Sequence, residues 1–233
     1  MTKICLVRMA ERKKPGRIGG KHQKDPLSDF GHQQAQILRD RLKKYRIDAI
    51  FSSTSITSIK TASIIAEPHD LSVERCPEFL EIDLGVWEGK TKEEMKSQHP
   101  DLYEVFFVNV PPNFGDMQVT PGSETRNQVR DRAVKKLDQI VGQWKDSNIL
   151  IVSHGHTIKV MICSLLGLDF TNIWKINQAN CALNLFEYDV ANVLFHLIGD
   201  TSHFEEKGIS SSSIQKELGG LAILGKAGLE MRG

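Results

Sequence analysis

The sequence contains no cysteine pair, no long apolar run and no excess of charge of one sign. Its cysteines, Cys5, Cys76, Cys163 and Cys181, are scattered without CxxC spacing, so neither a disulfide framework nor a metal site is expected. No stretch approaches the ~20 apolar residues that cross a bilayer. Lys and Arg number 30 against 29 Asp and Glu, whereas nucleic-acid binders carry a basic excess. We therefore expect no membrane segment and no nucleic-acid partner.

Signatures of cofactor binding and of secretion are absent as well. The chain has neither a P-loop nor a dinucleotide fingerprint, so no cofactor is implied. The first apolar run is too short for a secretory signal, which makes a cytoplasmic location the expectation. The 233 residues, 40% of them hydrophobic, are enough to bury a core without disulfides or metal.

Strand-like and helix-like segments alternate along the chain. Short apolar runs predict strands at residues 4–7, 48–52 and 148–153, and residues 73–75 are a candidate for a further short strand. Helical periodicity appears at 31–45, 56–66, 123–144 and 157–166. Residues 183–188 and 193–198 predict a closing hairpin. This alternation predicts an α/β fold, a three-layer α/β/α sandwich with a mostly parallel, doubly wound sheet.

Two stretches fall outside this alternation. Residues 90–122 contain Pro111, Pro112 and Pro121 and predict an insertion with short helices, after which Ser123 is the expected N-cap of the next helix. Residues 201–233 hold a serine run and a Gly/Leu-rich tail. We expect one domain over residues 1–200 and a weakly ordered C-terminal extension over 201–233. Alternatively, the tail forms a short apolar helix that docks onto this chain or a partner.

Ligands of open α/β sheets bind beyond the carboxyl ends of the parallel strands. In this sequence that rule selects residues 8–11, 52–57 and 153–156, together with Glu81. His154 and Gly155 stand where the last of these strands gives way to a helix, and helix N-termini favour anions. The sequence thus predicts one polar crevice built from distant segments.

Short motifs in these regions carry a family resemblance. They are ICLVR at 4–8, GRIGG at 16–20, DPLSDFG at 25–31, IFSS at 50–53 with KTA at 60–62, LEIDLGVWEG at 80–89, PGSET at 121–125 and LIVSHGHTIK at 150–159. In this order they resemble the histidine phosphatase superfamily, the phosphoglycerate mutase-like proteins, over residues 3–200. The resemblance implies the fold of that family and a phosphate pocket at the carboxyl edge of the sheet.

The resemblance also implies roles for individual residues. In the family an Arg-His-Gly motif ends the first strand, and its histidine attacks phosphorus and becomes a phosphohistidine. Arginines bind the phosphate and a glutamate protonates the leaving group. By this match Arg8 is the first arginine, Glu81 the acid and His154 the second histidine, whereas Gly155 and Asn180 are expected to contact the substrate.

The match fails at several of the family's key positions. Met9 stands where the nucleophilic histidine belongs, with Ala10 in place of the usual glycine. Pro15 replaces an asparagine that contacts phosphate in many members, and Thr57 replaces the second arginine. A thioether cannot accept a phosphoryl group as an imidazole does, and a lost guanidinium removes about 1.5–3 kcal/mol of phosphate binding. We therefore expect no ordinary phosphohistidine catalysis.

Nearby basic side chains could restore charge to such a pocket. The candidates lie on the first loop, residues 11–24 after the first predicted strand, and in the helix at 56–66. They are Arg12, Lys13, Lys14, Arg17 and Lys21 on the loop, and Lys60 one helical turn beyond Thr57. Solvated surface is the expected place for these charges. His156 is a candidate substitute for the missing histidine, although a cap or a solvent-exposed ring is expected there.

Three functions follow from this reading. The first is a protein that keeps part of an anion pocket and binds a small phosphorylated or carboxylated molecule without ordinary phosphatase or mutase activity. The second is an enzyme with altered acid–base or phosphoryl-transfer chemistry that uses His154 and Glu81. The third is a non-enzymatic partner or regulatory protein, and a homodimer or a protein partner is left open.

Overall fold

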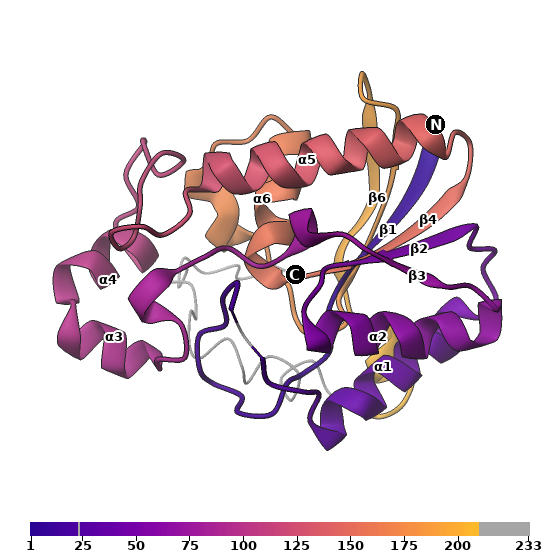
Figure 1. The fold of residues 1–233 in the computed structure, drawn as a ribbon, viewed down its shortest axis with the longest axis horizontal. Helices are drawn as coiled ribbons and strands as arrows, with labels where there is room; N and C mark the ends of the chain where they lie inside the picture. The colour runs from indigo at the N-terminus through magenta and orange to yellow at the C-terminus, as the bar shows by residue number, and fades with distance from the viewer. Residues whose placement is uncertain (23, 210–233) are drawn as a thin grey trace, which may run out of the picture.

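The computed structural model of the protein describes residues 1–22 and 24–209 (Figure 1). Its strands are β1 (Thr2–Arg8), β2 (Ala49–Ser52), β3 (Val73–Arg75), β4 (Asn148–Ser153), β5 (Leu183–Tyr188) and β6 (Val193–Asp200). Its α-helices are α1 (Asp29–Leu42), α2 (Ile56–Ala66), α3 (Lys92–Gln98), α4 (Pro100–Phe107), α5 (Arg126–Gln143), α6 (Gly155–Leu165) and α7 (Ser202–Glu205). Short 3-10 turns lie at η1 (Glu67–His69), η2 (Pro77–Phe79), η3 (Gly85–Trp87) and η4 (Phe170–Lys175).

The strands form one six-stranded sheet in the order β3-β2-β4-β1-β5-β6. The first four of these run parallel, and β5 and β6 add an antiparallel hairpin beside β1. The register places Arg8 opposite Ser153 and Ser52 opposite Val152. The carboxyl ends of β1, β2 and β4 therefore meet at one edge of the sheet.

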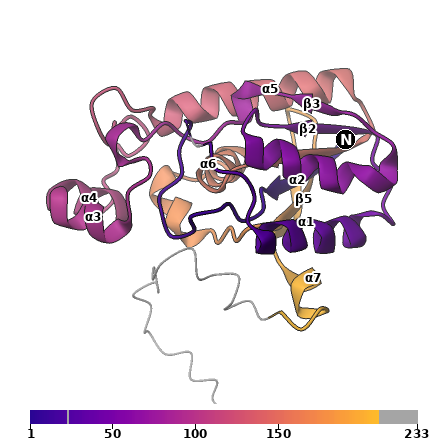
Figure 2. The ribbon, with the colours of Figure 1, turned by 60° about the horizontal axis from the view of Figure 1, so that its bottom comes forward.

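Helices cover both faces of this sheet, with α1 and α2 on one side and α5 and α6 on the other (Figures 1 and 2). Because side chains alternate along a strand, neighbours in β1 enter different cores. Val7 belongs to the same buried cluster as Leu38 of α1, whereas Leu6 belongs to the cluster that holds Leu137 of α5 and Ile158 of α6. The predicted α/β sandwich with a mostly parallel sheet is confirmed.

Residues 90–122 contain α3 and α4, which lie at one end of the molecule (Figure 2). Aromatic side chains form the core of this region. Phe106 packs edge-on against Trp87, with ring centroids 5.4 Å apart, and against Phe114, with centroids 5.6 Å apart. This separate core anchors the segment that follows Glu81.

Some predicted helix ends differ from those observed. The long helix α5 begins after Thr125, whose hydroxyl accepts from Gln128 N while the Gln128 side chain accepts from Thr125 N. Ser123, the expected N-cap, instead accepts a hydrogen bond from Thr120 N and belongs to the preceding turn. The prediction was wrong by two residues because a capping box outcompetes a single serine.

The described chain continues past residue 200 into α7, where Phe204 is fully buried in the core shared with α1. Most of the predicted C-terminal extension, residues 210–233, lies outside the described residues. Across the part of the chain that is described, no helix has both the length and the apolar character needed to cross a membrane.

Candidate functional site

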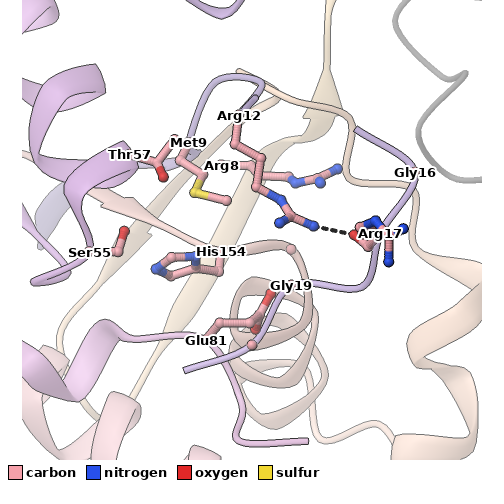
Figure 3. A pocket seen from close by; sticks show the side chains of 12 residues that line it. Arg8, Met9, Arg12, Gly16, Arg17, Gly19, Ser55, Thr57, Glu81 and His154 are labelled. Carbon is pink, nitrogen blue, oxygen red and sulfur yellow. Dashed lines mark hydrogen bonds between the residues drawn. The ribbon is translucent and has the colours of Figure 1, made fainter. Parts of the chain in front are cut away.

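A cavity of about 550 Å³, part of it open to solvent, lies at the carboxyl edge of the sheet (Figure 3). The end of β1, the β2–α2 turn, the β4–α6 turn and the loop after β1 form its walls. The lining residues are Arg8, Met9, Arg12, Gly16, Arg17, Gly19, Gly20, Ser55, Thr57, Glu81, His154 and Gly155. The fold thus brings the crevice segments selected from the sequence into one place.

Arg8 extends from the last residue of β1 into this cavity (Figure 3). Its Nη1 donates to the carbonyl oxygen of Gln178 at 2.6 Å, which fixes the guanidinium. Gly155 lies against it, and a Cβ at that position would be 3.2 Å from Arg8 Nε. Glycine at the start of α6 therefore leaves the space that the guanidinium occupies.

His154 is the N-cap residue of α6 and is 2% exposed. Its Nε2 lies 2.7 Å from the hydroxyl of Ser53 and 3.4 Å from that of Ser58. Burial lowers the pKa of His154 to about 4, reinforced by the positive charges of Arg8 and other arginines and opposed by Glu81. The imidazole is therefore neutral at pH 7, and its Nε2 lies within hydrogen-bond distance of two hydroxyl groups.

Glu81 lies in the cavity wall, and its carboxylate also caps the N-terminus of α6. Its Oε1 accepts from Thr157 N at 3.0 Å and from the Thr157 hydroxyl at 3.1 Å, and its Oε2 accepts from His156 N at 3.1 Å. These N–H groups have no partner within the helix, so the carboxylate satisfies them and complements the helix dipole. Arg132 of α5 donates to the carbonyl of Glu81 and thereby holds this segment in place.

Met9 has its thioether inside the cavity and is 8% exposed (Figure 3). Its backbone is tightly held: Met9 N donates to Ser153 O at 2.9 Å, and Asn180 Nδ2 donates to Met9 O at 3.1 Å. Asn180 is buried and is not among the lining residues. Its amide positions the backbone of Met9 from behind the cavity wall.

Thr57 and Pro15, two positions where we expect the sequence to depart from the family pattern, lie in different surroundings. The Thr57 hydroxyl donates to the carbonyl oxygen of Asp25 at 3.0 Å, and the residue lines the cavity at 1% exposure. Pro15 is exposed and does not line the cavity, whereas the adjacent Gly16 does. The loop backbone therefore forms this part of the wall.

Two arginines of the first loop line the cavity, although solvated surface was expected for them. Arg12 is 6% exposed, pairs with Asp25 at 3.2 Å and donates to the carbonyl of Arg17. Arg17 donates to the carbonyl of Gly89 at 2.7 Å. For Arg12 the expectation of solvated surface was wrong, because a carboxylate and a carbonyl turn its guanidinium inward.

The other basic candidates do not reach the cavity walls. Lys13, Lys14 and Lys60 are exposed, and Lys14 pairs with Asp25 at 3.6 Å. Lys21 is partly buried and is also not a lining residue. Of these basic candidates, only the arginines Arg12 and Arg17 line the cavity.

His156 points away from the cavity into the aromatic core. Its ring stacks on Phe106 with centroids 6.0 Å apart and meets Trp174 edge-on at 5.6 Å. Burial, followed by the charges of Arg126 and Lys159, lowers the pKa of His156 well below its usual value. Neither the cap nor the solvent-exposed ring expected for His156 is observed.

Sequence reasoning gave no role to Ser53, Ser58 or the glycines of the first loop. Ser53 stands within the IFSS motif at the end of β2, the position where polar side chains reach a parallel-sheet crevice. Gly19 and Gly20 line the cavity. A Cβ on Gly20 would be 2.1 Å from Glu88 Cδ, so a larger residue there would displace the Glu88 side chain.

Comparisons with known proteins agree with this architecture. Residues 4–201 match the family described as the histidine phosphatase superfamily (branch 1). Phosphoserine phosphatase 1 of Hydrogenobacter thermophilus is 28% identical over 88% of this chain and 96% of its own length.

Solved structures show the same similarity. YhfR of Bacillus stearothermophilus has a TM-score of 0.79 and 27% identity, with 87% of this chain and 99% of that one covered. A histidine-to-alanine mutant of phosphoserine phosphatase from Entamoeba histolytica, in complex with phosphoserine, has a TM-score of 0.76, 27% identity and the same coverage. With its sheet, its crevice and its matched length taken together, the chain belongs to branch 1 of the histidine phosphatase superfamily.

Proposed function

We propose that this protein binds a small phosphorylated or carboxylated molecule in the cavity without the phosphohistidine chemistry of its family. Met9 takes the place of the nucleophilic histidine at the end of β1. The pocket retains anion-binding groups while the group that would accept the phosphoryl moiety is gone. Binding and turnover are therefore separated in this chain.

The observation that carries the proposal is the composition of the cavity wall. Three guanidinium groups, those of Arg8, Arg12 and Arg17, line it together with a single carboxylate, that of Glu81. Guanidinium groups match the geometry of phosphate and carboxylate oxygens. Arg12 and Thr57 both contact Asp25, so Arg12 supplies a positive charge near the position where the family pattern places its second arginine.

The remaining histidine is poorly arranged to replace the missing nucleophile. His154 Nε2 is engaged by the hydroxyl of Ser53 at 2.7 Å, and the ring is 2% exposed. A thioether at Met9 has no titratable nitrogen and forms no stable phosphoryl adduct of the family's kind. These features support a binding function over covalent catalysis.

The Entamoeba histolytica protein gives a precedent for this separation. Its mutant lacks one histidine, yet its structure holds phosphoserine. A protein of this fold therefore keeps its phosphorylated ligand when a histidine is removed. The same protein has also been solved with 3-phosphoglyceric acid, another small molecule with a phosphate and a carboxylate.

Calorimetry on the full chain tests the proposal. Inorganic phosphate, phosphoserine and 3-phosphoglycerate are titrated into the protein, and release of phosphate from the two esters is followed under the same conditions. We expect saturable binding without turnover. An absence of binding at millimolar ligand contradicts the proposal, as does hydrolysis that passes through an acid-labile phosphoprotein.

A second candidate is altered acid–base or phosphoryl-transfer catalysis. Its support is that the carboxylate of Glu81 and the neutral imidazole of His154 line the same cavity. If a screened phosphate ester is turned over, Glu81→Gln and His154→Asn must each abolish that activity while the fold is retained. Activity that survives both substitutions excludes this candidate.

A further inference from the structure

Outside the cavity, three side chains of kinds that bind metal ions lie close together beside the first loop. His22, Asp83 and Glu88 each offer a ligand atom, and these atoms lie within 4.8 Å of one another. His22 Nε2 is 3.1 Å from Asp83 Oδ2. The histidine comes from the loop after β1, and both carboxylates come from the segment between Glu81 and α3.

Backbone hydrogen bonds hold both carboxylates in position. Asp83 Oδ1 accepts from Gly85 N at 2.8 Å, which leaves Oδ2 facing His22. Glu88 Oε1 accepts from Lys21 N at 2.9 Å, and Glu88 Oε2 accepts from His22 N at 3.1 Å. A carboxylate oxygen has two lone pairs, and Glu88 Oε1 uses both because it also accepts from Leu84 N at 3.3 Å. Asp83 Oδ2 and Glu88 Oε2 each have a single contact and keep a lone pair for a cation.

One imidazole and two carboxylates favour a particular class of metal ion. Imidazole nitrogen with carboxylate oxygen suits zinc and its neighbours in the first transition row, whereas calcium and magnesium take oxygen ligands. Zinc binds nitrogen and oxygen at about 2.0–2.2 Å, so the ligand atoms need to approach each other to roughly 3–3.5 Å. The His22 side chain is 70% exposed and can make this adjustment.

We propose that His22, Asp83 and Glu88 form a binding site for a divalent transition-metal ion, with water completing the coordination. The ion takes the place of the direct contact between His22 and Asp83 and bridges the loop after β1 to the segment after Glu81. This proposal does not depend on what the cavity binds.

Such a bridge has a consequence for the cavity. Gly19 and Gly20, directly before the site, line the cavity, and Gly20 packs against the Glu88 carboxylate. An ion at His22 therefore fastens the loop that carries Arg12 and Arg17. The bound ion is expected to reduce opening of this loop.

Zinc titration of the chelator-treated full chain, in competition with a chromophoric chelator and in phosphate-free buffer, tests the site. We expect one equivalent of zinc to bind. Loss of a residue that merely orients a ligand weakens metal sites about 10–100-fold, so His22→Ala should weaken binding at least that much. Because His22 is exposed and its backbone N–H is retained, this substitution leaves the contact to Glu88 intact.

His196→Ala is the matched control. His196 Nε2 lies 3.3 Å from Glu187 Oε1, a second solvent-accessible histidine–carboxylate pair, which belongs to no three-residue group among the described residues. Zinc affinity should be unchanged in this variant. Equal zinc affinity in the wild type and His22→Ala overturns the proposal, and so does an equal loss in both variants.

Tryptic cleavage of the loop gives a second readout. Arg12, Lys13, Arg17 and Lys21 are trypsin sites, whereas Pro15 protects the bond after Lys14. Zinc should slow cleavage at these sites in the wild type but not in His22→Ala. The cobalt(II) form of the wild type should in addition show a d–d absorption that His22→Ala lacks. Equal cleavage rates with and without zinc in the wild type contradict the bridge.

Discussion

The imidazole of His154 and the hydroxyl of Ser53, 101 residues apart in the sequence, lie 2.7 Å apart beside the cavity. This contact joins the end of β2 to the start of α6. It keeps a buried, neutral histidine at the cavity, where a protonated imidazole would add to the positive charge of the arginines. The buried histidine has consequences for stability as well as for binding.

Stability should fall as the pH drops from 6.5 to 4. Burial lowers the pKa values of His154 and His203 to about 4, so the unfolded chain takes up protons in this window and the folded chain does not. For His154 alone the shift from 6.5 corresponds to about 3 kcal/mol of unfolding free energy. Urea unfolding at several pH values measures the effect.

His154→Asn should make this pH dependence shallower. His196→Asn, which alters an exposed histidine on β6, is the control and should leave the slope as in the wild type. A slope that is identical in the wild type and His154→Asn would show that the imidazole is not held neutral by burial.

The cavity arginines should determine anion affinity. Hydrogen bonds to charged groups contribute about 1.5–3 kcal/mol each, so Arg8→Gln and Arg12→Gln should each weaken phosphate binding about 10–100-fold. Arg75→Gln, on the exposed edge strand β3, should leave the affinity unchanged. Calorimetry compares the three variants. Wild-type affinity in Arg12→Gln would remove Arg12 from the pocket's binding groups.

Glu81 should support the fold independently of any chemistry. Glu81→Ala leaves the N–H groups of His156 and Thr157 without their acceptor, which should lower the unfolding free energy by about 1–3 kcal/mol. Glu74→Ala, which changes a glutamate 61% exposed on β3, should have little effect. Denaturant unfolding distinguishes the two. Equal stability of Glu81→Ala and the wild type would contradict the capping role.

Much of the fold follows from the sequence because its signals are local. Helix α2 and strands β3 and β4 begin and end at the predicted residues. A serine cap marks the start of α2, and a short apolar run marks β4. The predicted helix at 31–45 ends earlier, at Leu42. Exposed polar residues at a helix end carry little information about where the last turn frays.

The site is predicted less completely because its geometry depends on distant partners. The motifs bring Arg8, Glu81 and His154 to one cavity, as parallel strand ends require. The inward turn of Arg12 depends on the carboxylate of Asp25 and on the path of the loop. No periodicity or spacing specifies those contacts.

The central claim, that this pocket binds phosphate but lacks the nucleophile, is tested most directly by phosphate release from p-nitrophenyl phosphate with the wild type, Met9→His and Met9→His/Thr57→Arg. Met9 already lines the cavity beside His154, so a histidine there has access to a bound phosphate. The account predicts no turnover by the wild type and a stepwise gain in the two variants. Wild-type turnover equal to that of Met9→His, or no gain in the double variant, would contradict it.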